Sequence, residues 1–218
     1  MANIVVHDLR GWATDKHRIT DDYPYGGGPG MVMKVEPIAR AIAELRTMNP
    51  GAAVALLSPQ GAPFCQPMAR RLSSLPGLIL VCGRYEGVDD RVRQFYCDME
   101  ISIGDYILTG GEIPAMAVVD AVLRLIPGAL GSQESVSDES HSNGLLEYPQ
   151  YTRPAEYEGR AAPEILLSGD HAKIVAWRRR EAIVKTAQLR PDLIEKAGLS
   201  GEEQQMAMKI IEDMKEKP

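Results

Sequence analysis

Few cysteines and no long apolar run occur in this sequence, and both absences narrow the class of protein. The three cysteines, Cys65, Cys82 and Cys97, lie far apart and outside any C-x-x-C spacing, which argues against a cysteine-bound zinc ion. We expect them to be buried free thiols in a reducing cytoplasm. No stretch approaches the ~20 apolar residues that cross a bilayer. The first residues also lack the charged and apolar regions of a secretory signal, so the sequence favours a cytoplasmic protein without a membrane partner.

An overall excess of positive charge is also missing. The chain carries 24 Lys and Arg against 30 Asp and Glu, a net charge of −6, whereas phosphate contacts need clustered cations. Basic residues gather in only one stretch, from His171 to Arg190, where Glu181 is the sole acid. They are Lys173, Arg178, Arg179, Arg180, Lys185 and Arg190. Composition alone favours a solvated helix face here over a nucleic-acid contact.

Helical patterns that alternate along the chain with short apolar runs predict an α/β protein. Helical patterns are expected over residues 35–48, 67–75, 89–95 and 112–125, and buried apolar strands over 52–57, 78–82 and 99–103. Strands that are apolar on both faces favour a parallel sheet with helices on both faces. We expect a first domain over 1–131, a mobile linker rich in Ser, Glu, Gly and Pro over 132–164, and a small helical domain over 165–218.

Each predicted strand runs directly into a loop that contains glycine. The loops cover residues 58–61, 83–87 and 104–112. In an open parallel sheet the carboxyl ends of the strands share one edge, where ligands bind, and glycine lets the backbone approach a ligand closely. The pattern therefore predicts a small-molecule pocket.

Several common sites are absent from these loops. No G-x-G-x-x-G follows a strand, which disfavours a Rossmann dinucleotide site or an ordinary Rossmann methyltransferase. The glycine cluster over 26–30 is not followed by Lys-Ser or Lys-Thr, so it is not a phosphate-binding P-loop, and by itself it indicates a flexible turn. Few acids lie in the three loops, so no residue is assigned as a metal ligand.

Six motifs, in their order and spacing, closely resemble the bacterial tRNA (guanine-37, N1)-methyltransferases of the SPOUT superfamily, and the resemblance covers nearly the whole chain. They are Pro24–Met31 (PYGGGPGM), Leu57–Gly61 (LSPQG), Gly83–Gly87 (GRYEG), Ile103–Tyr106 (IGDY), Gly110–Met116 (GGEIPAM) and Tyr151–Pro154 (YTRP). The resemblance implies a deep trefoil knot and a homodimer whose active sites are shared between subunits. Members of the family usually begin with a further strand and helix, with a Leu-Phe-Pro turn, before the segment that starts here at Ile4. The resemblance thus implies an N-terminally shortened chain.

The resemblance also implies the cofactor site. Three glycine loops are expected to hold S-adenosyl-L-methionine in a bent shape, with its adenine on the backbone of Ile103 to Leu108. The implied cofactor-binding residues are Leu57, Ser58, Pro59, Gly83, Tyr85, Glu86, Gly87, Ser102, Ile103, Gly104, Asp105, Tyr106, Ile107, Leu108, Gly110, Gly111 and Pro114. Glu86 is further implied to help recruit a Mg²⁺ ion.

Chemistry at guanine N1 needs a base for the departing proton and a cation near O6, where negative charge develops. By resemblance the cation is Arg124. From the residues alone, Arg124 would instead form an i, i+4 surface pair with Asp120. The implied base is Glu139, with Asp138 beside it as the alternative. Phosphate contacts to tRNA are expected from residues 173–185, Arg153 and Arg160.

Two other functions remain open from the sequence. One is a SPOUT methyltransferase that acts at another RNA position. The other is a non-enzymatic RNA-binding module whose pocket holds a nucleotide only for structure or regulation.

Overall fold

The computed structural model of this chain describes residues 2–129, 140–141 and 144–215. The chain forms two compact units, Met1–Gly131 and Ser132–Pro218. Both the candidate base Glu139 and its alternative Asp138 lie outside the described residues.

A three-stranded parallel sheet forms the centre of the first unit. Its strands are β3 (Ala53–Pro63), β4 (Leu78–Cys82) and β5 (Met99–Ser102), in the order β4-β3-β5. The pairing of β3 with β4 runs from Ala53 opposite Leu78 to Leu57 opposite Cys82. Its pairing with β5 shifts register between Leu57 and Ala62. The predicted parallel sheet is therefore confirmed, and β3 extends beyond the segment expected from its apolar run.

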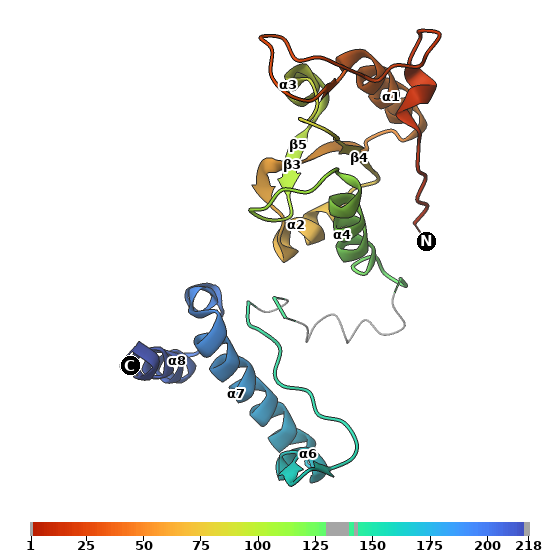
Figure 1. Ribbon diagram of the computed structural model, residues 1–218. Helices are drawn as coiled ribbons and strands as arrows, with labels where there is room; N and C mark the ends of the chain where they lie inside the picture. Colours follow the sequence, from red (N-terminus) through yellow and green to blue (C-terminus); the bar gives the residue numbers. More distant parts are fainter. Residues whose placement is uncertain (1, 130–139, 142–143, 216–218) are drawn as a thin grey trace. The chain divides into compact units, whose positions relative to one another are not determined.

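Helices cover both faces of this sheet, as predicted (Figure 1). On one face, α1 (Val35–Met48) and α3 (Asp90–Tyr96) pack in a core that contains Ile38, Ile42, Val54 and Val92. On the other, α2 (Gln66–Ser73) and α4 (Glu112–Leu123) pack in a core of Leu57, Leu72, Ile101 and Val118. Each core residue here is at most 5% exposed. Burial of this kind contributes about 1.5–3 kcal/mol per large apolar side chain.

Short elements near the N-terminus hold one of the pocket loops. They are η1 (Leu9–Trp12) and the antiparallel pair β1 (Asp21–Asp22) and β2 (Val32–Met33). Met33 donates its N–H to the carbonyl of Gly87 at 2.9 Å, and its carbonyl accepts from Asp89 N at 2.9 Å. Glu86 N donates to the carbonyl of Met31 at 3.1 Å. This segment therefore extends the backbone hydrogen bonding of the loop over 83–87.

The second unit is mainly helical. It contains α6 (Glu164–Leu167), α7 (His171–Leu189), η2 (Pro191–Lys196) and α8 (Gly201–Lys215). The side chain of Asp170 caps α7 by accepting from Lys173 N at 3.2 Å. Its core is small, and consists of Leu145, Ala182, Ile183, Ala187, Ile194 and Ala207.

Part of the segment expected to be a linker belongs to this unit. Leu145 is 5% exposed and packs in the core. Leu146 N donates to Oγ1 of the fully buried Thr186 at 2.8 Å, and that hydroxyl donates to the carbonyl of Ala182 at 2.6 Å. Further along, β6 (Glu156–Tyr157) and β7 (Arg160–Ala161) form a hairpin. The sequence did not predict this hairpin, because strands of two residues show no periodicity.

The cysteines depart from the expectation of buried thiols. Cys65 is exposed, just before α2, and this part of the prediction was wrong. Cys82 and Cys97 are half-buried, and burial raises the pKa of each thiol to about 11. No described helix is both long and apolar enough to cross a membrane.

Candidate functional site

A cavity of about 320 Å³ lies where the three strands end. This volume is at the lower end of the range that holds small ligands. Its walls come from the ends of β3, β4 and β5, from the loops that follow them, and from the starts of α3 and α4. All of the predicted cofactor-binding residues except Asp105 line this cavity. Asp105 is exposed at the tip of a tight turn closed by a 3.0 Å hydrogen bond from Tyr106 N to the carbonyl of Gly104.

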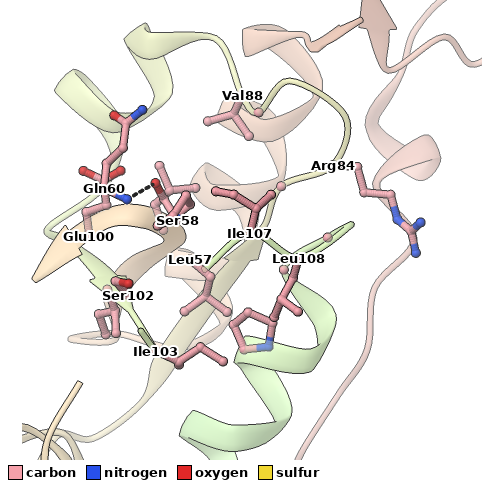
Figure 2. A pocket seen from close by; sticks show the side chains of 18 of the residues that line it. Leu57, Ser58, Gln60, Arg84, Val88, Glu100, Ser102, Ile103, Ile107 and Leu108 are labelled. Carbon is pink, nitrogen blue, oxygen red and sulfur yellow. Dashed lines mark hydrogen bonds between the residues drawn. The ribbon is translucent and has the colours of Figure 1, made fainter. Parts of the chain in front are cut away.

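The first loop leaves the straight part of β3 at Leu57. Ser58 Oγ accepts from Gln60 N at 3.1 Å and so tightens this turn (Figure 2). Gly61 then passes so close to β5 that a Cβ built on it would lie 2.4 Å from Ile101 N. Glycine is needed here because the obstacle is backbone rather than a movable side chain.

The second loop, over 83–87, is a turn closed by a 3.0 Å hydrogen bond from Gly87 N to the carbonyl of Arg84. Tyr85 has a φ of 58° and Gly87 a φ of 113°. The glycine cluster of the PYGGGPGM motif meets this loop at Gly30, where an added Cβ would lie 2.6 Å from Glu86 Oε1. Residues that looked like a flexible turn in the sequence therefore form a contact surface for Glu86.

The third loop closes the cavity over the end of β4. Gly111 N donates to the carbonyl of Gly83 at 2.9 Å, and a Cβ on Gly111 would lie 2.6 Å from Cys82 Cα. The buried Ser102 uses its hydroxyl to bind both the carbonyl and the N–H of Gly104, at 3.0 and 3.2 Å. Apolar side chains dominate this end of the cavity, and they are Leu57, Ile103, Ile107, Leu108 and Pro114.

Two arginines line the cavity, and each already has a carboxylate partner. Arg84 Nε lies 2.9 Å from Glu112 Oε1, and in Figure 2 its side chain points away from the other labelled side chains. Arg93 Nε lies 2.7 Å from Asp90 Oδ1. The hydrogen bond from Arg93 holds the pKa of Asp90 below its usual value. These pairs leave Glu86 and Glu100 as lining carboxylates that form no ion pair among the residues the structure describes.

Several lining residues were not predicted: Leu56, Gln60, Arg84, Val88, Asp90, Arg93, Glu100, Ile101 and Thr109. Gln60 and Arg84 stand inside the LSPQG and GRYEG motifs, so the motifs themselves could have identified them. Asp90, Arg93 and Glu100 reach the cavity from α3 and β5. The packing of α3 beside the strand ends brings Asp90 and Arg93 to the site, whereas Glu100 stands on β5 itself.

The predicted catalytic arginine lies at the end of α4. Arg124 is the C-cap of that helix and is half-buried, and its backbone N–H donates to the carbonyl of Asp120 at 3.3 Å. It does not belong to the residues that line the cavity. Within the described parts of the chain, no three His, Cys, Asp or Glu side chains gather closely enough to hold a metal ion.

The basic stretch on α7 is less uniformly solvated than its composition suggested. Arg179 donates to both carboxylate oxygens of Glu203, at 2.7 and 3.1 Å. The guanidinium of Arg178 lies 4.8 Å from the centre of the Tyr148 ring, a cation–π contact. Arg180 remains exposed at the next position. The three consecutive arginines therefore have three different surroundings.

Comparison with known proteins agrees with this geometry. Residues 1–196 match the family described as tRNA (Guanine-1)-methyltransferase TrmD. A tRNA (guanine-N(1)-)-methyltransferase of Chloroflexus aggregans is 59% identical over 199 residues, which cover 91% of this chain and 78% of the relative. Proteins of the same name from Syntrophotalea carbinolica and Citrifermentans bemidjiense are 53% and 51% identical. They match over 96% and 100% of this chain and 85% and 87% of their own lengths. The chain therefore belongs to the tRNA (guanine-N1)-methyltransferase family, as its glycine-loop motifs predicted.

Proposed function

We propose that this protein transfers a methyl group from S-adenosyl-L-methionine to N1 of guanosine 37 in tRNA, the nucleotide after the anticodon. The observation that carries the proposal is the cavity at the strand ends, whose lining brings together the loops of the family motifs. The family match favours an enzyme over a non-enzymatic RNA-binding module, because the matching relatives are named methyltransferases.

The chemistry of the lining suits this donor. Apolar side chains at one end offer a slot for an adenine ring, and the turn over 103–108 presents peptide groups to its edge. When bound, the donor supplies a methyl group on a good leaving group, so positioning provides much of the rate. The chain must therefore hold the methyl carbon in line with guanine N1 and exclude water.

Two side chains are proposed to handle the charge that changes during transfer. Glu139 takes the N1 proton as general base, with Asp138 as the alternative. Arg124 stabilises the negative charge that develops toward O6. Glu86 is proposed to help recruit a Mg²⁺ ion to the cavity. One carboxylate satisfies few of the six oxygen ligands typical of Mg²⁺, so substrate and water oxygens would complete its shell.

The proposal includes the architecture that the family implies. The chain is expected to contain a deep trefoil knot and to act as a homodimer with shared active sites. Exposed apolar side chains on α4 support the dimer: Ile113 is 59% exposed and Met116 is 71% exposed. The two residues are three positions apart and so lie on the same side of this helix, and exposed apolar side chains grouped on one surface can mark a protein interface.

Phosphate contacts to tRNA are proposed for the second unit. Arg180 is exposed and its nearest carboxylate, on Glu181, is 3.9 Å away, so it is a better candidate than the engaged Arg179. Arg153 and Arg160 are also exposed. Replacing Arg180 with Glu should raise the KM for tRNA and reduce the slope of log K against log salt by roughly one unit. Cofactor affinity should not change.

The decisive experiment uses tRNA transcripts that differ at one position. The protein is incubated with labelled S-adenosyl-L-methionine and transcripts that carry guanosine or adenosine at position 37. Label is expected only in the first, as 1-methylguanosine in the nuclease digest. Labelling of both transcripts to the same extent would place the reaction at another nucleotide. Binding of the donor without any turnover would support a non-enzymatic role instead.

A further inference from the structure

Met33, which follows the PYGGGPGM motif, contacts the second loop at three points. Its N–H donates to the carbonyl of Gly87 at 2.9 Å, and its carbonyl accepts from Asp89 N at 2.9 Å. Its thioether sulfur, Sδ, accepts from Arg84 N at 3.2 Å. One residue of the N-terminal segment therefore holds both ends of a loop that lies far from it in the sequence.

The sulfur of Met33 serves as a hydrogen-bond acceptor and as part of an apolar contact. Met33 is half-buried and, like Val81 and Val88, packs against the core that contains Val92. A thioether suits this position because it is apolar enough to pack there and is still a weak acceptor for an N–H group. The hydrogen bond to Arg84 N therefore depends on the chemical state of the sulfur.

Oxidation of a thioether changes both of these properties. The sulfur lone pair attacks one oxygen of hydrogen peroxide, the O–O bond breaks, and the hydroxide that leaves takes up the proton of the transferred oxygen to become water. Sulfur is oxidised to the sulfoxide and the peroxide is reduced. The acceptor is then the new oxygen rather than the sulfur, and the side chain has become polar. At Met33 this change would place a polar group among apolar neighbours and move the acceptor away from Arg84 N.

We propose that Met33 is a redox-sensitive contact of the second loop: its oxidation by peroxide releases the loop over 83–87 and weakens binding of the methyl donor. The effect on the donor rests on the proposed function, in which the cavity holds S-adenosyl-L-methionine. The release of the loop does not, because it follows from the three contacts of Met33. Since methionine sulfoxide reductases reverse this oxidation, methyl transfer would fall reversibly under oxidising conditions.

Two thiols compete with Met33 as targets of peroxide. Cys65 is exposed, and Cys82 is half-buried directly before Gly83. Burial raises the pKa of Cys82 to about 11, so little of its reactive thiolate is present at neutral pH. Dithiothreitol reduces sulfenic acids and disulfides but leaves methionine sulfoxide unchanged. Treatment with this thiol therefore separates oxidation of cysteine from oxidation of methionine.

The experiment measures the loop and the ligand separately. The protein is treated with hydrogen peroxide and then with dithiothreitol, and peptide mass spectrometry reports oxidation at each methionine. Hydrogen exchange of the peptide over 83–89 reports the loop, and calorimetry with S-adenosylhomocysteine reports the cavity. In the unchanged protein, oxidation of Met33 should speed exchange in this peptide and weaken binding on the order of five- to tenfold. Methionine sulfoxide reductase should restore both values.

Met33→Leu is the informative variant, because leucine packs like methionine but offers neither an acceptor nor a site for peroxide. Its loop should exchange faster before treatment, and peroxide should then change neither measurement. Met48→Leu is the matched control, since Met48 is 60% exposed at the end of α1. This variant should respond to peroxide as the unchanged protein does.

Several outcomes would overturn the proposal. They are an equal response of Met33→Leu to peroxide, oxidation of Met33 that leaves exchange or affinity unchanged, and no oxidation of Met33 under conditions that oxidise Met48. If the untreated protein did not bind S-adenosylhomocysteine, the proposed function itself would fail. Hydrogen exchange would still decide in that case whether oxidation of Met33 releases the loop.

Discussion

Gly111 offers a sharp test of how the cavity is built. Its φ and ψ are −81° and −3°, values open to any residue, so alanine introduces no backbone strain there. A Cβ would nevertheless lie 2.6 Å from Cys82 Cα and 3.0 Å from Gly83 N. Cys82 Cα is the last Cα of β4 and Gly83 N follows it. Because both are backbone atoms, rotating a side chain cannot relieve either contact. The third loop must move away from the strand end.

The size of the effect follows from three contributions. Overpacking costs about 1–3 kcal/mol, and losing the Gly111 N to Gly83 carbonyl bond costs about 0.5–1.5 kcal/mol. The reduced entropy of the unfolded chain offsets about 0.4–1 kcal/mol of this. We expect the free energy of unfolding to fall by about 0.5–4 kcal/mol, and each kcal/mol lowers Tm by about 2–4 °C in a chain of this length. Affinity for S-adenosyl-L-methionine should fall as well, because the displaced loop lines the cavity.

Gly83→Ala is the control for this experiment. Its Cβ would meet only Val88 Cγ1 at 3.5 Å, an ordinary contact. Scanning calorimetry measures Tm for both variants. Gly111 donates and Gly83 accepts the same hydrogen bond, so the two substitutions differ mainly in the space available to the added Cβ. If Gly111→Ala melted at or above the temperature of Gly83→Ala, the tight closure of the third loop on β4 would be refuted.

Three further predictions concern other parts of the chain. Gly104→Val should weaken S-adenosyl-L-methionine binding at least tenfold in calorimetry while circular dichroism shows a retained fold, because Gly104 has a φ of 153° and its Cβ would meet the Tyr106 ring at 2.4 Å. Unchanged affinity would remove the pocket assignment. Thr186→Val should cost about 1–3 kcal/mol in urea unfolding, because the N–H of Leu146 loses its acceptor in the core. Thr186→Ser, which keeps the hydroxyl, should lose less. The hydrogen bond from Arg179 is the largest cause that lowers the pKa of Glu203 from 4.5 to about 2. The contribution of this Arg179–Glu203 pair to the free energy of unfolding should therefore be complete above pH 4.5 and disappear as the pH falls through 2. In Glu203→Gln this part of the pH dependence should vanish.

Apolar runs and glycine positions predicted much of the first unit. The strand over 78–82 and the helix over 35–48 have the predicted bounds. Both have a strong local pattern, since one is a continuous apolar run and the other ends at Asn49-Pro50-Gly51. β3 was predicted to end near Leu57 because its later residues are polar or small. Its continuation to Pro63 depends on a second set of bonds to β5 after a register shift, which no local pattern reveals.

Charged side chains were harder to interpret from sequence. Arg178, Arg179 and Arg180 are identical residues in a row, so composition treats them alike. Successive residues on a helix point about 100° apart, so each one faces different neighbours. Arg179 meets Glu203 on α8 and Arg178 covers Tyr148, whereas Arg180 faces solvent. Only one of the three therefore keeps the solvated character that the sequence suggested for the whole stretch.

The PYGGGPGM motif shows the same limit from the opposite direction. As a local sequence its glycines indicate flexibility, since each adds conformational freedom to the unfolded chain. In the fold, the residues after them bind the second loop through Met31 and Met33, and Gly30 leaves just enough room for the carboxylate of Glu86. A side chain at position 30 would meet the Glu86 carboxylate and force it to shift, although the two residues lie far apart in sequence. The motif therefore constrains a cavity residue through a long-range contact, and its glycines serve close packing as well as turning.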